Sequence, residues 1–341
     1  MTQRRPTSFD IAALAGVSQP TVSRALSGSS SVSAQTRRRV MEAAEQLNYK
    51  VDKNASGLRR QHTKTLALLF FEESPGAALL NPFYLSLVGP MVRCCAKQGY
   101  DLLISIQQLS SDWHVDYEDS RKADGIILLG YGDYLEYRPK LQKLVDRGAH
   151  FVRWGSAIEG ELGATVASDN EQGGFEATSH LLQNGRRRIA FVGTVDPGYP
   201  EFLERWNGYR RALCAAGIQV DPSLQVDANP SEASGREAAE QLMARAAEFD
   251  AVFAACDIAA IGVMHALQAI GQRVPQDVAL VGFDDIPSAS LSGPPLTTVA
   301  QDPRAASDAL VETVIQSIEL GCSANRVLPV RLIVRESSVS V

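Results

Sequence analysis

The sequence is short of long apolar runs. None of its 341 residues belongs to a stretch of the roughly 20 apolar residues that a membrane-spanning helix needs. The N-terminus also lacks the apolar segment of a secretory signal peptide. These absences argue against a membrane anchor and predict a protein that acts in the cytoplasm.

Cysteine and histidine are scarce as well, with five residues of each. The cysteines are odd in number and stand at no metal-ligand spacing, and the histidines are scattered along the chain. This usage argues against a disulfide framework and favours a reducing compartment. We expect neither a metal site nor a cofactor.

Catalytic motifs are missing too. The sequence contains no G-x-S-x-G, no phosphate-binding P-loop and no dinucleotide fingerprint after a first strand. We therefore predict no catalytic residues. Acidic side chains at predicted strand ends, described below, keep a doubly wound enzyme open as a distant alternative.

Positive charge is confined to one end of the chain. Residues 1–64 carry a net charge of +7, whereas the rest of the chain carries −13. A basic segment attached to an acidic body predicts that only the N-terminal segment contacts a polyanion such as DNA. A solvated basic surface would explain the charge, but not its confinement to one end.

Residues 8–26, SFDIAALAGVSQPTVSRAL, have the pattern of two short helices joined by a tight turn. Ser8 and Ser18 are suitable N-caps, and Gly16 stands where a left-handed residue would end the first helix. This pattern predicts a helix-turn-helix, with an ordinary helical hairpin as the alternative. Residues expected on the facing apolar sides are Ile11, Ala12, Leu14, Ala15, Val22, Ala25 and Leu26.

Polar side chains remain on the outer side of the second predicted helix. Hydrogen-bonding groups at the start of such a helix reach base edges in the major groove of DNA. The predicted outward set is Gln19, Thr21, Ser23 and Arg24.

A third helix and a linker follow. Ser33 is expected to cap a helix that runs to about Asn48, in which Arg37–Arg39 either contact phosphate or form a solvated basic face. Residues 50–64 have linker composition, with Leu58 as the one sizeable apolar side chain. Such a leucine is either accidental or a wedge that enters a minor-groove step. We therefore divide the chain into residues 1–49, 50–64 and 65–341.

From Thr65 onward, apolar strand-like segments alternate with amphipathic helices as far as DVALVGFDD at residues 277–285. Repeated β-α-β units predict parallel sheets with helices on both faces. Two such sets predict two doubly wound lobes. Ligands of this class bind at the carboxyl ends of the strands.

Acidic, amide, basic and aromatic side chains gather at those predicted strand ends. Carboxylates, amides and guanidinium groups bind the hydroxyls of a neutral polyol, and aromatic rings contact the flat face of a sugar. Core packing of Trp154 and Phe283, an N-cap role for Asp285 and a surface ion pair of Arg205 are the alternatives. The candidates are Tyr131, Arg153, Trp154, Asp169, Asn170, Arg205, Trp206, Asp257, Phe283, Asp284 and Asp285.

The segments DIAALAGVSQPTVSRALSG and VSAQTRRRVMEAAEQLNY resemble the DNA-binding headpiece of the lactose-repressor family of bacterial transcription regulators. NPFY, SDNEQGG, RRRIAFVG, ERWNGYRRAL and VGFDD resemble the effector domain of that family, so the resemblance covers essentially the whole chain. It implies an all-α headpiece, a hinge and a two-lobed α/β domain like the periplasmic sugar-binding proteins. It also implies a homodimer, a pseudo-palindromic operator in double-stranded DNA and a small-molecule effector.

The resemblance also assigns roles to individual residues. It places Gln19, Pro20 and Arg24 where the family reads bases, and it makes Leu58 the wedge of the hinge. The predicted DNA-binding set is Ser18, Gln19, Pro20, Thr21, Ser23, Arg24 and Leu58. The implied effector contacts are Arg205, Asp257 and Asp284, and the implied pocket rim is Asn81, Phe83 and Asp169. Three positions depart from the family: Pro20 replaces a side chain able to reach a base, Val51 stands where a proline is common at the start of the hinge, and Cys256 stands where asparagine often precedes the aspartate.

The sequence thus predicts a repressor whose operator affinity is controlled by a small sugar or glycoside. A cytoplasmic sugar-binding protein and a regulator that answers a non-sugar metabolite are the alternatives. Neither the identity of the effector nor its role as inducer or co-repressor follows from the sequence.

Overall fold

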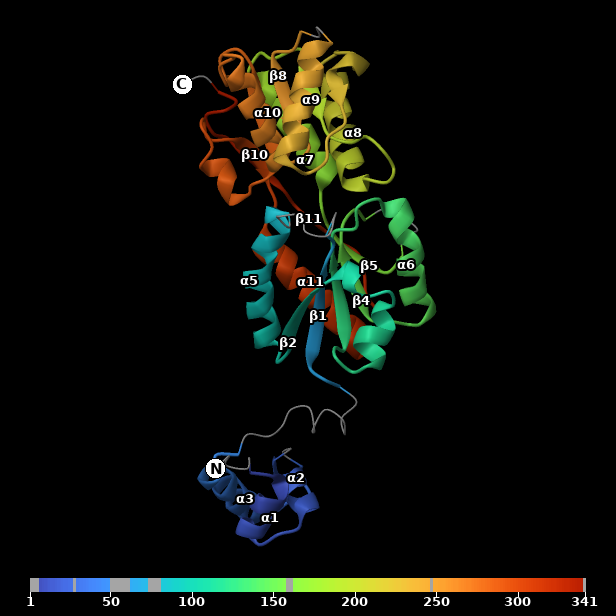
Figure 1. The fold of residues 1–341 in the computed structure, drawn as a ribbon, viewed down its shortest axis with the longest axis vertical. Helices are drawn as coiled ribbons and strands as arrows, with labels where there is room; N and C mark the ends of the chain where they lie inside the picture. The colour runs from blue at the N-terminus through green and yellow to red at the C-terminus, as the bar shows by residue number, and fades with distance from the viewer. Residues whose placement is uncertain are drawn as a thin grey trace. The chain divides into compact units, whose positions relative to one another are not determined.

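The computed structural model describes residues 6–26, 29–49, 62–72, 81–157, 162–245 and 248–339. The chain forms two compact units, Met1–Thr63 and Lys64–Val341 (Figure 1). Leu58 lies outside the described residues, so its contact with DNA stays a prediction.

The described part of the N-terminal unit contains three helices, α1 (Ser8–Ala15), α2 (Gln19–Leu26) and α3 (Ala34–Gln46). Gly16 ends α1 in the left-handed conformation, with φ of 62°, as predicted. Ser33 caps α3 as predicted, since its hydroxyl accepts from the amide of Thr36 at 3.2 Å. The buried core comprises Ile11, Ala12, Ala15, Val22, Ala25, Val32, Val40, Ala43 and Ala44.

Two predicted details of this unit are wrong. The N-cap of α1 is Thr7 and not Ser8, and both the amide and the hydroxyl of Thr7 donate to Oδ2 of Asp10 at 2.7 Å. The side chain of Leu14 is 51% exposed instead of packing in the core. Ile11 and Ala15 already form the buried stripe of this two-turn helix, and Leu14 lies to one side of it.

The second unit contains two six-stranded sheets, which define two lobes. All the paired strands are parallel except β10 and β12, so the predicted pair of doubly wound lobes is confirmed. In sheet order, lobe 1 contains β11 (Arg326–Leu328), β5 (Ala164–Ser168), β4 (Phe151–Trp154), β3 (Gly125–Leu129), β1 (Thr65–Phe70) and β2 (Asp101–Ile106). Lobe 2 contains β12 (Arg331–Ile333), β10 (Thr297–Ala300), β9 (Ala279–Asp284), β8 (Ala251–Ala254), β6 (Ile189–Val192) and β7 (Gln225–Val226).

Helices cover both faces of each sheet (Figure 1). Lobe 1 carries α5 (Pro82–Lys97), α6 (Tyr134–Asp146) and α11 (Pro303–Leu320), and the short helices Gln107–Leu109 and His114–Asp119. Lobe 2 carries α7 (Asn170–Gln183), α8 (Pro200–Ala215), α9 (Glu232–Ala244) and α10 (Asp257–Ala269), and the short helices Pro222–Leu224 and Pro287–Ser290.

The strand sequences explain this layering. In β1 the side chains of Leu66, Leu68 and Phe70 pack with those of α5, whereas Ala67 and Leu69 pack with those of α6. Both faces of the strand are therefore apolar, which is why β1 is a continuous hydrophobic run and not an alternating one.

The chain passes between the lobes three times, from β5 to α7, from β10 to α11 and from β11 to β12. Two of these crossings are joined where the amide of Asp169 donates to the carbonyl of Leu328 at 2.9 Å. The sequence analysis identified no element after Asp285, so β10, α11, β11 and β12 are additions from the structure.

Helices α7 and α8 pack backbone against backbone. A Cβ at Gly174 would collide with the carbonyl of Arg205, and one at Gly208 would collide with the carbonyl of Glu171. Glycine is required at both positions because any side chain would separate the helices. The main chain that carries Arg205 thus lies directly on α7.

Within the described ranges, no helix is long and apolar enough to cross a bilayer. The same residues contain no group of three or more His, Cys, Asp or Glu side chains placed to hold a metal ion.

Candidate functional site

The outer surface of α2 carries the predicted DNA-reading side chains. Val22 and Ala25 point into the core of the unit, which leaves Ser18, Pro20 and Arg24 exposed. The other three members of the predicted set, Gln19, Thr21 and Ser23, are partly buried. The structure therefore places all six on α2 and the residue before it, and their contact with DNA stays a prediction.

Contacts within the unit hold this surface in place. Nε2 of Gln19 donates to Oγ of Ser8 at 3.2 Å, which links α2 to the start of α1. Arg39 donates to the carbonyls of Ala15 and Gly16, where α1 ends. Arg37 donates to the carbonyl of Ser29 at 2.6 Å. Two of the three consecutive arginines of α3 therefore make contacts inside the unit.

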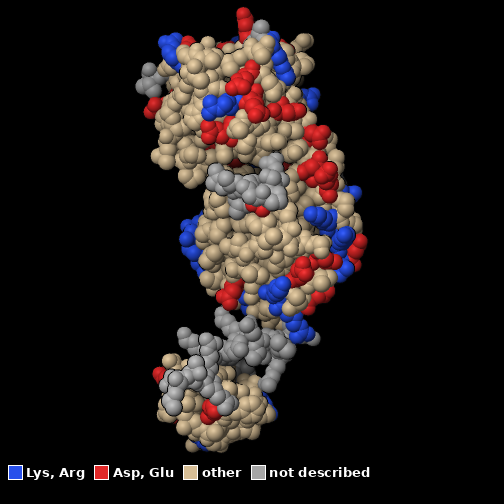
Figure 2. Space-filling view, viewed as in Figure 1, with Lys and Arg blue, Asp and Glu red and all other residues tan. Residues whose placement is uncertain are grey.

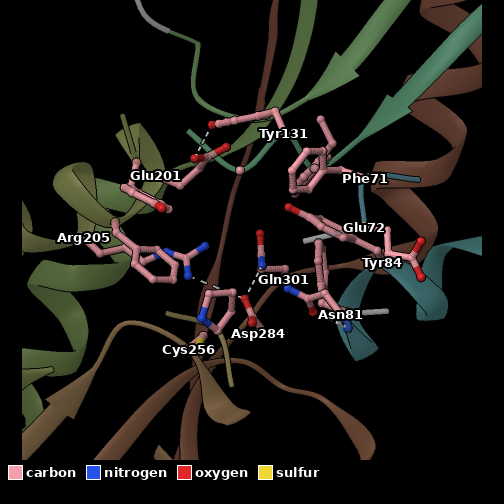
Figure 3. Close-up of a pocket in the computed structure, with 17 residues that line it drawn as sticks. Phe71, Glu72, Asn81, Tyr84, Tyr131, Glu201, Arg205, Cys256, Asp284 and Gln301 are labelled. Atoms are coloured by element: carbon pink, nitrogen blue, oxygen red, sulfur yellow. Dashed lines mark hydrogen bonds and ion pairs between the residues drawn. The ribbon is translucent and has the colours of Figure 1, made fainter. Parts of the chain in front are cut away.

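A second candidate site is a cavity between the two lobes, at the carboxyl ends of their strands (Figure 3). Seventeen of the described residues line it. Arg205, Cys256, Asp284 and Gln301 come from lobe 2 and from its crossing to lobe 1. Figure 3 shows Phe71, Asn81 and Tyr84 of lobe 1 on the opposite wall.

Arg205 is the best-fixed polar group of the cavity. Its side chain is buried, and its guanidinium carbon lies 3.7 Å from the ring centre of Phe283 and 5.4 Å from that of Phe202. Nε donates to Oδ1 of Asn170 at 2.9 Å, and Nη1 donates to the carbonyl of Ala255. Among the described residues, none accepts a hydrogen bond from Nη2. Two donors of a rigid guanidinium are thus left for a ligand.

Asp284 stands beside Arg205 at the end of β9. Its Oδ1 lies 3.7 Å from Nη1 of Arg205 and accepts from Nε2 of Gln301 at 2.6 Å. Burial raises the pKa of this carboxyl to about 6, although Arg205 and Gln301 act in the opposite direction. Oε1 of Gln301 is buried and has no hydrogen-bond partner within the described part of the chain. This end of the cavity therefore offers both donors and acceptors.

Aromatic rings form much of the remaining wall. Phe83 packs against Trp154 with ring centres 5.5 Å apart, and against Tyr84 at 5.9 Å. Tyr131 approaches from the end of β3, and its hydroxyl donates to Oε2 of Glu201 at the start of α8. That hydrogen bond joins lobe 1 to lobe 2 across the cavity. Burial is the main cause of the raised pKa of Tyr131, so its hydroxyl stays protonated.

The structure brings six of the ten predicted effector residues together. Trp154 and Asp284 are the last residues of β4 and β9, Tyr131 follows β3, and Arg205 comes from α8. Asn81 and Phe83 line the cavity from α5 and its N-cap.

The other four predicted effector residues lie outside the cavity lining. Asp169 caps α7, with Oδ1 accepting from the amide of Gln172 at 3.0 Å. The ring of Trp206 stacks on that of Tyr209 with centres 4.9 Å apart, and it packs against the core of lobe 2. Phe283 lies beneath Arg205 and supports its guanidinium. Packing and capping thus account for these three residues.

Asp257, the fourth, is fully buried and accepts from Oγ1 of Thr298 at 2.5 Å and from the amide of Ile286 at 2.9 Å. These bonds fix the turn after β9, in which Asp284 has a φ of 116°. Burial raises the pKa of Asp257 well above its ordinary value. The carboxyl therefore supports the cavity from behind.

Two substitutions test whether Asp257 stabilises the fold through its hydrogen bonds to Thr298 and Ile286. Asp257→Ala should lower the free energy of unfolding by roughly 3 kcal/mol, because it leaves two buried donors without an acceptor. Asp257→Asn retains one acceptor and gains a donor for Thr298, so we expect a loss of only about 1 kcal/mol. Urea denaturation measures both values. Equal losses in the two variants would contradict a hydrogen-bonding role.

The burial of Asp284 predicts a pH dependence of stability. Its pKa rises from 3.8 in a free carboxyl to about 6 in the fold. A raised pKa means that the folded state disfavours ionisation, so the associated stability is present below pH 3.8 and is lost as the pH rises through 6. Relative to Asp284→Asn, the parent should lose about 3 kcal/mol over this range. Urea denaturation of both proteins from about pH 4.5 to about pH 7 tests the sign, and parallel curves would contradict it.

Several cavity residues were not among the predicted contacts. Gln301 follows β10, a strand that the sequence analysis did not identify, so no strand-end argument reached it. Glu201 and Phe202 lie in the first turn of α8, where nothing in the sequence distinguishes them from other helix residues. Cys256 lines the cavity at the N-cap of α10, and burial raises its thiol pKa to about 12, so the thiol stays protonated. The family departure at position 256 would have been the signal for this residue.

Comparisons with known proteins find relatives for both units of the chain. The family "Bacterial regulatory proteins, lacI family" matches residues 9–52, and "Periplasmic binding protein-like domain" matches residues 178–338. The HTH-type transcriptional regulator CelR of Thermobifida fusca is 34% identical over 98% of this chain and 99% of its own length. A solved structure described as a transcriptional regulator CelR–cellobiose complex is 32% identical, with a TM-score of 0.73 and coverage of 98% and 100%. The Lac repressor dimer bound to operator and the anti-inducer ONPF, at 24% identity, shares the fold with a TM-score of 0.83 and coverage of 99% and 100%.

Proposed function

Because this chain belongs to the lacI family of bacterial regulatory proteins and is a DNA-binding transcriptional regulator, we propose that it is a repressor whose operator affinity is set by a neutral sugar in the cavity between its lobes. The observation that carries this proposal is the juxtaposition of Arg205, Asp284 and Gln301 with an aromatic wall. Polar groups at one end bind hydroxyls, and rings along the side pack on the apolar face of a pyranose.

The charges of the cavity favour a neutral ligand. Among the described residues, its lining includes the carboxylates of Glu72, Glu201 and Asp284 and one guanidinium, that of Arg205. Asp284 already neutralises Arg205 at 3.7 Å, so a phosphate or carboxylate group would face uncompensated negative charge. The unpartnered Oε1 of Gln301 requires a hydrogen-bond donor, which a hydroxyl supplies.

A disaccharide is the first candidate. The rings of Phe71, Phe83, Tyr84 and Trp154 line the apolar wall of the cavity. They extend the surface available to a ligand beyond the polar end. The structure described as a CelR–cellobiose complex contains such a sugar in a relative. A flat non-sugar metabolite that stacks on these rings is the second candidate, favoured by the same aromatic wall.

The N-terminal unit is proposed to read operator DNA. Ser18, Gln19, Pro20, Thr21, Ser23 and Arg24 would face the major groove, and Leu58 would enter the minor groove at the centre of the site. Two copies would place their α2 helices about one helical turn apart on a pseudo-palindrome. Such a regulator acts in the cytoplasm, on chromosomal DNA, and we assign no catalytic role to the cavity carboxylates.

We propose that two copies pair through lobe 1. β2 is an edge strand whose Leu103 and Ile104 are exposed, and Leu85 and Val92 are exposed on α5 beside it. Figure 2 shows a broad face of this lobe with few charged side chains. An edge strand with exposed apolar side chains needs a covering partner.

Ile104→Glu should therefore yield a monomer, because it places a charge in the proposed interface. Sedimentation equilibrium measures the assembly state, and we expect operator affinity to fall by roughly a hundredfold since two linked readers become one. Leu109→Glu, at a residue that is 79% exposed in the short helix after β2, is the control and should stay dimeric. A dimeric Ile104→Glu would place the interface elsewhere.

The proposed effector is tested by thermal melting and by operator titration with the full chain. Cellobiose at a hundred times its dissociation constant should stabilise the fold by about 2.7 kcal/mol and change the affinity for a selected operator fragment. Glucose 6-phosphate, the anionic control, should do neither. A response to the phosphorylated sugar or to a purine, with none to neutral sugars, would overturn the proposal.

A further inference from the structure

Three hydrogen bonds connect Arg205 to the opposite lobe. Nε of Arg205 donates to Oδ1 of Asn170 at 2.9 Å, and Nδ2 of Asn170 donates to Oε2 of Glu204 at 2.9 Å. The other carboxylate oxygen of Glu204, Oε1, accepts from the hydroxyl of Ser156 at 2.5 Å. We call Ser156, Glu204, Asn170 and Arg205 the relay.

The relay fixes the orientation of the Asn170 side chain. Its Nδ2 donates to Glu204 and also to the carbonyl of Ser168 at 3.1 Å. A carboxylate and a carbonyl are acceptors only, so they hold the NH₂ end of the amide and turn its oxygen toward Arg205. Because Asn170 and Ser156 are almost completely buried, water does not replace these partners without cost.

The members of the relay belong to parts of the fold that move relative to each other when the lobes shift. Ser156 follows β4 in lobe 1, whereas Glu204 and Arg205 are consecutive residues of α8 in lobe 2. Asn170 is the first residue of α7, directly after the first crossing between the lobes. Ser156 is itself held in lobe 1, since its carbonyl accepts from Nη2 of Arg153 at 3.0 Å.

None of the three residues behind Arg205 lines the cavity. Their effect on a ligand must therefore act through Arg205, whose Nε has Asn170 as its acceptor. A shift of lobe 1 that withdraws Ser156 leaves one oxygen of Glu204 without its donor and loosens the amide of Asn170.

We propose that Glu204 and Asn170 are positioning residues that make the orientation of Arg205 depend on the arrangement of the two lobes. The inference rests on the proposed function, in which Arg205 binds the effector. By reciprocity, an effector held by Arg205 stabilises the lobe arrangement in which the relay is intact. The relay thus links the occupied cavity to the relative position of the lobes.

The first test needs no ligand. Ser156→Ala, Asn170→Ser and the double variant of the full chain are compared by thermal melting. Ser156→Ala should lower the melting temperature by about 2–4 °C in the parent, and by less than half as much when Asn170 is already replaced. The two side chains do not bond to each other, so this non-additivity reports coupling through Glu204. Additive losses would overturn the relay.

Two further variants serve as controls. Ser307→Ala removes a hydroxyl that donates to the carbonyl of Leu87 at 2.9 Å inside lobe 1, and its loss should add to that of Asn170→Ser. Glu204→Gln can accept from Asn170 and donate to Ser156, so it should melt near the parent, while Glu204→Ala should not. A glutamine variant as unstable as the alanine variant would contradict the hydrogen-bonding role.

The second test uses cellobiose as the probe. Ser156→Ala should weaken its binding about three- to tenfold in the parent and have no effect in the Asn170→Ser background. Tyr131→Phe removes the separate hydrogen bond to Glu201. It should change cellobiose binding by the same factor in the parent and in the Asn170→Ser background. An undiminished effect of Ser156→Ala beside Asn170→Ser would overturn the relay. If cellobiose does not bind the parent, the proposed sugar is wrong, and the melting cycle still decides whether the relay exists.

Discussion

Arg205→Ala should abolish the effect of the sugar on operator binding and weaken sugar binding by roughly a hundredfold. The guanidinium has two unused donors at Nη2, and hydrogen bonds from a charged donor contribute about 1.5–3 kcal/mol each. Its loss also leaves Asp284 without a counter-charge, so the remaining carboxyl is protonated at a higher pH than in the parent. Calorimetric titration with cellobiose and operator titration with and without the sugar measure these effects.

The matched control is Arg211→Ala on the same helix. Arg211 is exposed and pairs with Glu171 at 2.6 Å, outside the cavity. Its removal should leave sugar binding within about twofold of the parent, since a surface ion pair contributes less than about 1 kcal/mol. Because Arg205 is buried, circular dichroism must first establish that Arg205→Ala is folded. A folded variant with a normal sugar response would remove Arg205 from the site.

Arg24→Ala should weaken binding to the preferred operator by roughly 10- to 100-fold and relax the preference at one base pair. Arg24 is exposed in the last turn of α2, on the side of the helix opposite the buried Val22 and Ala25. A guanidinium that bonds a base edge contributes about 1–3 kcal/mol of discrimination against the wrong base. Titration of an operator set with every single base substitution measures both affinity and preference.

Arg38→Ala provides the comparison for loss of charge alone. Arg38 is exposed on α3, outside the predicted DNA-reading set, and carries the same charge as Arg24. We expect a smaller loss that is uniform across operators and reduces the salt dependence. If Arg24→Ala behaves in the same uniform way, Arg24 contacts phosphate and does not read a base.

The sequence carries much of the fold because its local signals are strong. The run TLALLFF is apolar on both faces and predicts a buried parallel strand, and Gly16 predicts the end of α1. Leu14 was misplaced because an eight-residue helix has too few turns to define the edge of its apolar stripe. Of the strands after Asp285, β11 pairs with β5, which lies far earlier in the sequence, and strands of three residues such as β11 and β12 carry little local signal.

The site was only partly predictable for a related reason. The strand-end rule finds both Asp257 and Asp284, since each stands at or just after the end of a strand of lobe 2. Their different roles follow from the backbone of the turn after β9. Asp284 adopts a positive φ and lines the cavity, whereas the buried carboxyl of Asp257 accepts a hydrogen bond from that turn. Such a difference depends on contacts with Thr298, which is distant in sequence.

The glycine contact between α7 and α8 bears on how this protein could evolve. Because there is no space between the two backbones, neither Gly174 nor Gly208 tolerates replacement. The backbone of Arg205 is therefore fixed in position. A lineage that acquires a new effector would therefore change the opposite wall, at positions such as Phe71, Phe83 and Tyr84. The lobe 2 side of the pocket would then stay constant during evolution, while the lobe 1 side changes.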